Sequence, residues 1–200
     1  MSPALLKKAI LHLRKDVRLK GIEAHRPEFT RSRDPFEALC RAIVGQQLSV
    51  KAAATIYARF GTIYGTAPTP RAVSKTPIAK LRAAGLSGQK ASYVQDLARK
   101  FLDCTIEPSK FGKMTDEEIR AHLVAVKGIG RWTADMFLMF TLHRPDVLPT
   151  GDLGIQKGMQ KVFKLKKLPS PDQMQKLAAP WAPHRSVACY YLWHLLDKQA

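Results

Sequence analysis

The chain has 200 residues, 46% of them hydrophobic, which is enough to bury the core of one domain or of two closely packed lobes. Its 33 lysines and arginines outnumber its 16 aspartates and glutamates, and the resulting formal charge of +17 predicts a polyanionic partner. No apolar run approaches the roughly 20 residues of a membrane span, and the N-terminus lacks the apolar stretch of a secretory signal. We therefore expect a protein that is not secreted and has no membrane partner.

Cysteine and histidine usage gives no sign of a disulfide framework or a metal site. The three cysteines, Cys40, Cys104 and Cys189, lie far apart in the sequence, and no Cys-x-x-Cys pair occurs. The six histidines lack the i, i+4 spacing of helical metal ligands. We expect reduced cysteines in the core and a protein that requires neither a metal nor an organic cofactor.

Helix starts are marked along the chain by a capping residue followed by proline. Proline suits the first helical position because its missing N–H would have no partner there, while the residue before it accepts a hydrogen bond from a free amide. This pattern occurs at Ser2-Pro3, Asp34-Pro35, Thr69-Pro70, Thr76-Pro77 and Ser170-Pro171. Asp34 with Glu37, and Thr115 with Glu118, add the spacing of a capping box.

Apolar residues recur with helical spacing behind these starts, for example over residues 6–17 and 50–60. Neither sustained apolar/polar alternation nor an Asn-Gly or Asp-Gly hairpin turn between such runs occurs. The least regular stretches, residues 61–69, 103–114 and 144–151, are expected to be surface loops. The sequence thus predicts an all-α fold with roughly eight to ten short helices.

The most informative segment is residues 123–134, where an apolar helix end is followed by the turn Gly128-Ile129-Gly130 and by a second helix. Glycines permit left-handed backbone and close approach, and free amides at the start of a helix attract phosphate. Lys127 and Arg131 add positive charge on either side of the turn. Taken alone, the pattern fits a phosphate-binding hairpin or an ordinary helix-turn-helix corner equally well. A nucleotide-binding P-loop is excluded because no Gly-x-x-x-x-Gly-Lys-Ser/Thr run is present.

Four further motifs stand in order around this hairpin: RAIVGQQLSV at residues 41–50, GLSGQKA at 85–91, DVLPTGD at 146–152, and the stretch from Trp181 to Trp193. Together with the hairpin they resemble the helix-hairpin-helix (HhH-GPD) DNA glycosylase superfamily, and within it the 3-methyladenine DNA glycosylase II branch. The resemblance extends over about residues 34–196.

This resemblance implies a single HhH-GPD domain over residues 1–200, folded as two helical lobes with a cleft between them. One lobe would comprise residues 34–145, including the hairpin at 123–134, and the other residues 1–33 with 146–200. The N-terminal β-rich domain that some relatives carry is expected to be absent.

The resemblance also implies that Asp152 is the catalytic carboxylate. It would stabilise the positive charge that develops on the sugar as the glycosidic bond breaks. The same residue is placed to cap a helix beginning near Leu153, and capping is compatible with catalysis because it favours the ionised carboxylate. Relatives that also cut the DNA backbone carry a lysine where this chain has Trp132, so the tryptophan implies hydrolysis without lyase activity.

By the same resemblance, the wedge that fills the gap left by a flipped nucleotide comes from the turn at residues 46–49, with Gln47 as the wedge and Leu48 as the alternative. Alternatively, the glutamine pair at this helix end bonds nearby backbone. Trp132 and Trp193 match positions that line the base pocket, where aromatic faces attract the cationic ring of an alkylated purine. The alternative for both is an ordinary core position. Met136 replaces a residue that is often aromatic in the relatives, and either a pocket or a core role fits it.

A third set of residues is expected to contact the DNA backbone. It consists of Ser49, Lys127, Gly128, Gly130, Arg131 and Thr133. No metal is required, although relatives hold a monovalent cation on hairpin carbonyls, here those of Val124, Val126 and Ile129.

Together these features predict a monomeric base excision repair glycosylase that removes alkylated purines of the 3-methyladenine and 7-methylguanine type from double-stranded DNA. Its location would be cytoplasmic, associated with the nucleoid, or nuclear. Two alternatives remain: a glycosylase for another lesion, such as uracil, a mismatch or an oxidised base, and a non-catalytic DNA-binding module.

Overall fold

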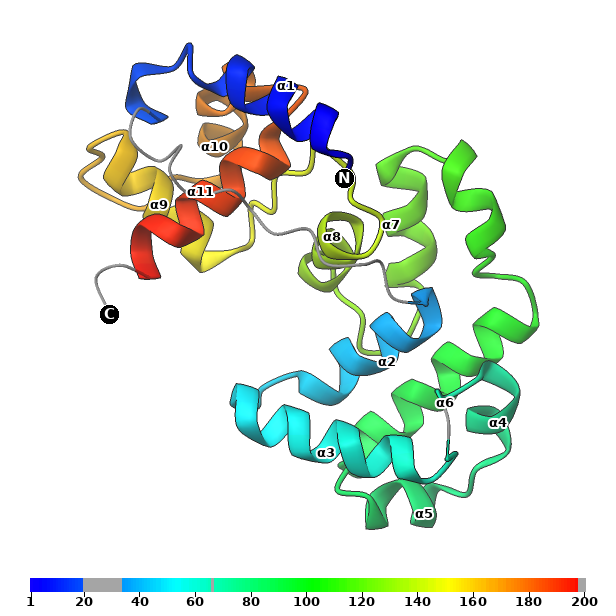
Figure 1. The fold of residues 1–200 in the computed structure, drawn as a ribbon. Coiled ribbons are helices and arrows are strands. Elements are labelled where there is room, and N and C mark those ends of the chain that lie inside the picture. The colour runs from blue at the N-terminus through cyan, green and yellow to red at the C-terminus, as the bar shows by residue number, and fades with distance from the viewer. Residues whose placement is uncertain (20–33, 66, 198–200) are drawn as a thin grey trace. The chain divides into compact units, whose positions relative to one another are not determined.

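The computed structural model describes residues 1–19, 34–65 and 67–197. Within these ranges the chain forms eleven α-helices and no β-strand, which confirms the predicted all-α fold (Figure 1). The helices outnumber the expected set because two short ones, α4 (Pro70–Lys75) and α5 (Ile78–Ala83), follow each other with only Thr76 and Pro77 between them. Proline disfavours helical backbone in the residue before it, so the chain breaks there and starts a new helix.

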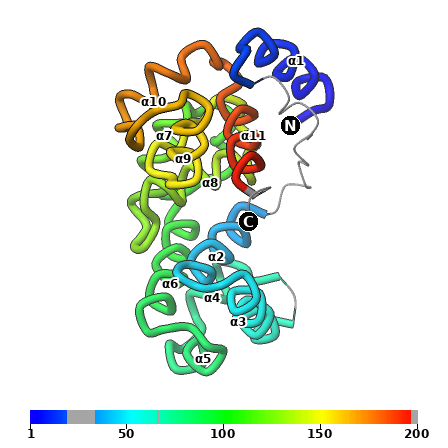
Figure 2. The backbone as a smooth tube through the Cα atoms, turned by 90° about the vertical axis from the view of Figure 1, so that its left-hand side faces the viewer, coloured from blue at the N-terminus to red at the C-terminus, as the bar shows by residue number. Residues whose placement is uncertain are grey.

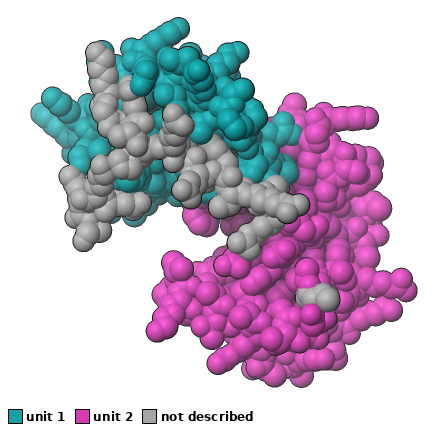
Figure 3. All heavy atoms as spheres, viewed as in Figure 1, with its two compact units in different colours: residues 1–32, 138–200 teal, residues 33–137 magenta. Residues whose placement is uncertain are grey.

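The chain divides into two compact units, shown in separate colours in Figure 3. Unit 1 comprises Met1–Ser32 and Leu138–Ala200, and unit 2 comprises Arg33–Phe137. The boundary falls inside α8 (Arg131–Phe140). The lobe limits drawn from the sequence, and the cleft between the lobes, stay predictions.

Unit 2 is organised around α6 (Gly88–Leu102). The helices α2 (Pro35–Gly45), α4 and α5 pack against α6, and α3 (Val50–Thr62) packs against α2 (Figure 2). Burying each large apolar side chain of such a core stabilises the fold by about 1.5–3 kcal/mol. The fully buried side chains include Phe36, Leu39, Ile43, Phe60, Leu81, Val94 and Leu97. This core fixes the C-terminal end of α2 and the first turn of α6, where several site residues lie.

The remainder of unit 2 consists of η3 (Pro108–Lys113), α7 (Asp116–Val124) and most of α8. At the start of α7, the Thr115 hydroxyl accepts a hydrogen bond from the Glu118 N–H, and the Glu118 carboxylate accepts one from the Thr115 N–H. The capping box predicted here is therefore confirmed.

Unit 1 is built on the packing of α9 (Leu153–Val162) against α11 (Arg185–Asp197). Gly158 permits a close approach: a Cβ atom there would lie 2.8 Å from Leu192 Cβ and 3.1 Å from the Leu192 carbonyl oxygen. The first helix, α1 (Pro3–Leu13), also packs against α11. The other described elements of this unit are η1 (Val17–Leu19), α10 (Pro171–Leu177), η4 (Ala179–Trp181) and the end of α8.

Four of the five predicted capping residues before proline do cap helices. The side chains of Ser2, Asp34, Thr69 and Ser170 each accept a hydrogen bond from a first-turn amide. The prediction for Thr76 is wrong. Its hydroxyl donates to the Ala72 carbonyl at 2.9 Å and so closes α4, while α5 begins at Ile78 with Pro77 as its N-cap residue and without a side-chain cap.

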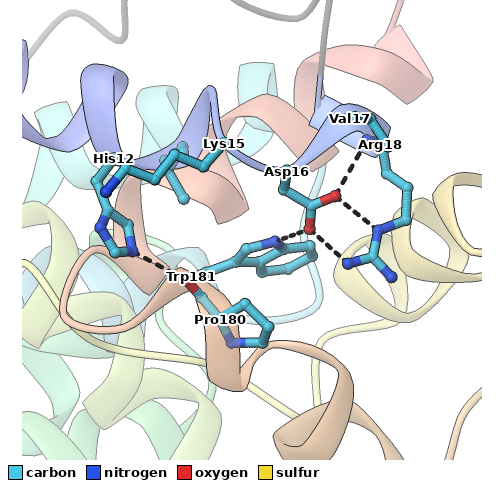
Figure 4. Close-up of a pocket in the computed structure, with 8 residues that line it drawn as sticks. His12, Lys15, Asp16, Val17, Arg18, Pro180 and Trp181 are labelled. Atoms are coloured by element: carbon cyan, nitrogen blue, oxygen red, sulfur yellow. Dashed lines mark hydrogen bonds and ion pairs between the residues drawn. The ribbon is translucent and has the colours of Figure 1, made fainter.

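Trp181, which opens the last sequence motif, belongs to the core of unit 1. It is fully buried, and its indole Nε1 donates to Asp16 Oδ2 at 2.8 Å (Figure 4). Arg18 donates to both oxygens of the same carboxylate, and its guanidinium lies 4.3 Å from the Phe163 ring centre. Burial opposes ionisation of Asp16, but these hydrogen bonds outweigh it and lower the pKa of the carboxyl. The hydrogen bond from Trp181 thus ties η4 to Asp16, the residue before η1, beside the hollow drawn in Figure 4.

Cys40 in unit 2 and Cys189 in unit 1 are fully buried, whereas Cys104 is exposed. None of the three forms a disulfide within the described residues, but the core position expected for Cys104 is wrong. Among the described helices, none combines the length and the hydropathy that a membrane crossing requires.

Candidate functional site

The predicted hairpin is present between α7 and α8. Gly128 takes a left-handed backbone conformation, with φ at 82°, and the Ile129 N–H donates to the Val126 carbonyl at 3.1 Å. A Cβ atom on Gly128 would lie 2.1 Å from the ring of Tyr93, so glycine is required here both by backbone geometry and by space. Gly130 is different because a Cβ atom on it would meet nothing.

A chain of ion pairs braces the two hairpin helices. Arg120 of α7 donates to Asp135 of α8 at 2.6 Å and to Glu117 at 2.7 Å. Glu117 also accepts two hydrogen bonds from Arg131, at 3.0 and 3.2 Å. Burial raises the pKa of Asp135, and Arg120 opposes that rise. The phosphate contact of Arg131 stays a prediction. It requires the Arg131 guanidinium either to break its hydrogen bonds to Glu117 or to bind the phosphate and Glu117 at the same time.

The predicted wedge lies in the turn between α2 and α3. Gln47 is exposed and has a φ of 57°, which is rare for a residue with a side chain. Leu48 is 37% exposed, and Ser49 caps α3 by accepting a hydrogen bond from the Ala52 N–H. The turn therefore presents Gln47 and Leu48 at the surface of unit 2.

Gln46 and Lys90 hold this turn; for Gln46 the sequence offered a contact with nearby backbone as an alternative, and for Lys90 it gave no role. The Gln46 side-chain Nε2 donates to the Gly128 carbonyl at 2.8 Å. The Lys90 ammonium donates to the carbonyls of Val44 at 2.8 Å and of Gln46 at 2.6 Å. Both residues belong to motifs that resemble the family. The sequence around them does not show which backbone carbonyl, far away in the chain, each side chain binds.

A hollow of about 810 Å³ in unit 2 collects the hairpin and wedge residues. Trp132 lines it and is 49% exposed, which is unusual for a tryptophan in a folded domain. Met136 lines it as well and is partly buried. The lining residues named by the sequence analysis are Gln47, Leu48, Gly128, Gly130, Trp132, Thr133 and Met136.

Asp152 lies in unit 1, at the start of α9. It is 9% exposed, and its Oδ1 accepts hydrogen bonds from the Ile155 N–H at 2.8 Å and from the Trp193 indole Nε1 at 2.9 Å. The capping role predicted for Asp152 is confirmed. Trp193, predicted separately, is in direct contact with the same carboxylate.

The space for this contact is provided by Gly154. A Cβ atom there would lie 2.9 Å from Trp193 Cδ1 and 3.0 Å from Asp152 Oδ1, both tighter than ordinary side-chain contacts. Any larger residue would have to displace the indole, the carboxylate or both.

Two aromatic residues that sequence reasoning missed surround Trp193. Its ring stacks on Phe140, with centres 5.8 Å apart and planes at 24°, and meets Tyr190 edge-on at 5.9 Å. Phe140 is 45% exposed, and burial raises the pKa of Tyr190. A signal for Phe140 was present, because Trp132, Met136 and Phe140 recur every four residues and so share one face of α8.

Nothing in the described residues forms a metal centre built from three or more histidine, cysteine, aspartate or glutamate side chains. The Val126 carbonyl, one of the three proposed for a monovalent cation, already accepts a hydrogen bond within the hairpin. A cation on the carbonyls of Val124, Val126 and Ile129 stays a prediction.

Comparison with known proteins gives the family. Residues 40–184 match the model of the HhH-GPD superfamily base excision DNA repair proteins. The chain is 36% identical over 164 residues to DNA-3-methyladenine glycosylase 1 of Schizosaccharomyces pombe, covering 80% of this chain and 72% of that protein. The chain belongs to the HhH-GPD superfamily of base excision DNA repair proteins.

Solved structures agree with this assignment. The S. pombe 3-methyladenine DNA glycosylase Mag1, in complex with abasic DNA, superposes with a TM-score of 0.81 at 34% identity, covering 93% of this chain and 95% of that one. A DNA-3-methyladenine glycosidase from Bacillus halodurans gives a TM-score of 0.84 at 33% identity, covering 96% of this chain and 88% of that one.

Proposed function

We propose that this chain is a monofunctional DNA glycosylase that removes alkylated purines, of the 3-methyladenine and 7-methylguanine type, from double-stranded DNA. The observation that carries the proposal is Asp152, a nearly buried carboxylate held by two N–H donors. Relatives that align with most of this chain are named 3-methyladenine glycosylases, and their names support the same substrate class.

The role of Asp152 follows from the chemistry of base loss. The target nucleotide has to leave the helical stack, which costs a few kcal/mol, before an enzyme can reach its glycosidic bond. As that bond breaks, positive charge develops on the sugar, and a fixed carboxylate stabilises it without reorganising. The hydrogen bonds from the Ile155 N–H and the Trp193 indole hold Asp152 in one orientation for this purpose.

Aromatic side chains supply the preference for alkylated bases. Alkylation at a ring nitrogen makes a purine cationic, and cations are attracted to aromatic faces by about 0.5–2 kcal/mol. Trp193 stacks on Phe140 beside Asp152, and Trp132 is half-exposed in the hollow of unit 2. We assign the two tryptophans to the base pocket, with Met136 as a softer surface beside Trp132.

The absence of lyase activity is the third part of the proposal. Cutting the backbone through an imine requires an amine at the hairpin, and position 132 holds an indole. Lys127 precedes the turn and is assigned to a phosphate contact. The product is then an abasic site in an intact strand.

A panel of duplexes, each with one lesion, tests the proposal. We expect release of 3-methyladenine and 7-methylguanine, strand breakage only after alkaline treatment, and no covalent adduct with borohydride. Asp152→Asn should lower the single-turnover rate by about a hundredfold to a thousandfold, the range seen when one transition-state contact is lost. Its affinity for an abasic-site duplex should stay close to that of the wild type.

Asp172→Asn is the matched control, because Asp172 is an exposed aspartate in the first turn of α10. If the protein excises uracil or an oxidised base and not alkylpurines, the proposed substrate class is wrong, while the glycosylase activity stands. Binding to damaged duplex without any base release would make the chain a DNA-binding module.

A further inference from the structure

A polar bridge joins three separate elements of unit 2 around the 46–49 turn. Lys90, in the first turn of α6, bonds the Val44 and Gln46 carbonyls at the end of α2. The side chain of Gln46 then bonds the carbonyl of Gly128, in the hairpin. The bridge therefore links α6 to the wedge turn and the wedge turn to the hairpin.

The position of Lys90 is not explained by the needs of its own helix. A cation near a helix N-terminus opposes the helix dipole, whereas a cation at a helix C-terminus is stabilised by it and satisfies free carbonyls. Lys90 is in the first turn of α6, but its ammonium lies at the C-terminal end of α2. Within the described residues it forms no ion pair, and burial lowers its pKa.

The turn that Lys90 holds is strained. Left-handed backbone is unfavourable for a residue with a side chain, and Gln47 adopts it next to the carbonyl that Lys90 binds. A wedge that fills a gap in the DNA stack works best when its conformation is set in advance. The contacts of Lys90 and Gln46 supply that constraint.

We propose that Lys90 and Gln46 are positioning residues. They hold the wedge turn, residues 46–49, against the hairpin, so that the nucleotide is extruded while the hairpin binds the DNA backbone. This inference rests on the proposed glycosylase function. It gives Lys90 no role at the reacting sugar.

The test compares two substrates, one with the damaged base correctly paired and one with it opposite an abasic site. Lys90→Met should lower the single-turnover rate on the paired substrate by about tenfold to a hundredfold, because extrusion breaks pairing and stacking and needs the wedge. On the substrate that is already unpaired, the loss should be no more than about threefold, since little extrusion work remains. Gln46→Leu, on a different element, should show the same substrate dependence.

Lys100→Met, on the same helix, is the control and should match the wild type on both substrates. A second readout needs no base release: 2-aminopurine beside an abasic-site analogue should brighten on binding of the wild type and less on binding of Lys90→Met. Equal losses on both substrates, or no loss in either variant, would overturn the positioning role. If the wild type releases no base at all, the glycosylase function fails instead, and the fluorescence result still judges the inference.

Discussion

At the scale of single residues, the Oδ1 oxygen of Asp152 accepts two hydrogen bonds, one from the first turn of α9 and one from α11. Hydrogen bonds to charged groups are worth about 1.5–3 kcal/mol each, so the carboxylate has one strongly preferred orientation. The residue that makes room for this arrangement is Gly154, whose missing side chain leaves space for the Trp193 indole.

Gly154→Ala should therefore impair base release more than folding. The added Cβ would push the Trp193 indole or the Asp152 carboxylate by some tenths of an ångström, and misplacing catalytic groups lowers rates by about tenfold to a hundredfold. Single-turnover excision and thermal unfolding should be measured together. Gly151→Ala is the local control, since a Cβ there meets nothing. A Gly154→Ala enzyme with unchanged rate would show that the contact with Trp193 is not needed.

At the scale of elements, the hairpin depends on contacts outside its own two helices. Tyr93 of α6 packs on Gly128, Gln46 bonds the carbonyl of the same glycine, and the Lys127 N–H donates to Asp96 of α6 at 2.9 Å. Three contacts from α6 and Gln46 thus hold the turn, and its free amides keep a fixed direction.

Gly128→Ala and Gly130→Ala separate the two glycines of the hairpin. Gly128→Ala should cost about 2–5 kcal/mol of unfolding free energy, because left-handed strain adds to the overlap with the Tyr93 ring. Gly130→Ala should stay within about 0.5 kcal/mol of the wild type, as its Cβ meets nothing. Urea unfolding of both variants checks this, and similar stabilities would contradict the account of Gly128.

Helix starts were the part of the fold that local sequence predicted best, because capping by Ser2, Asp34 or Thr115 depends on neighbours three residues away. Thr76 failed for a related reason: its hydroxyl had a competing partner one turn back, the Ala72 carbonyl. In the candidate site, motifs located Asp152 and Trp193 but not their mutual hydrogen bond, which joins residues 41 positions apart. The partner of Gln46 and the role of Lys90 were missed since they come from tertiary packing, whereas Phe140 was missed although it continues the four-residue spacing of Trp132 and Met136.

At the scale of the whole molecule, the formal charge of +17 dominates the approach to DNA. A protein that neutralises several phosphates releases counterions, so its affinity falls steeply as salt rises. Single lysines at the DNA contribute about one unit to the slope of log affinity against log salt. The exposed side chain of Lys127, next to the hairpin turn, is assigned to this group.

Lys127→Gln should weaken binding to damaged and undamaged duplex alike and reduce that slope by about one. Fluorescence anisotropy over a salt series measures both effects. Lys110→Gln is the control, because the Lys110 ammonium already pairs with Glu107 at 2.7 Å. A slope that does not change for Lys127→Gln would place this lysine away from phosphate.

The three thiols are distributed so that each unit contains one that is sealed from solvent, Cys40 in unit 2 and Cys189 in unit 1, while Cys104 is open. A thiol reagent attacks the exposed thiolate, and burial raises the pKa of Cys40, which suppresses its reactivity in the folded state. With Cys104 replaced by serine, the labelling rate of Cys40 reports local opening of unit 2, and that of Cys189 reports local opening of unit 1. Labelling kinetics followed by peptide mass would then give two separate opening free energies from one protein, without introducing any new cysteine.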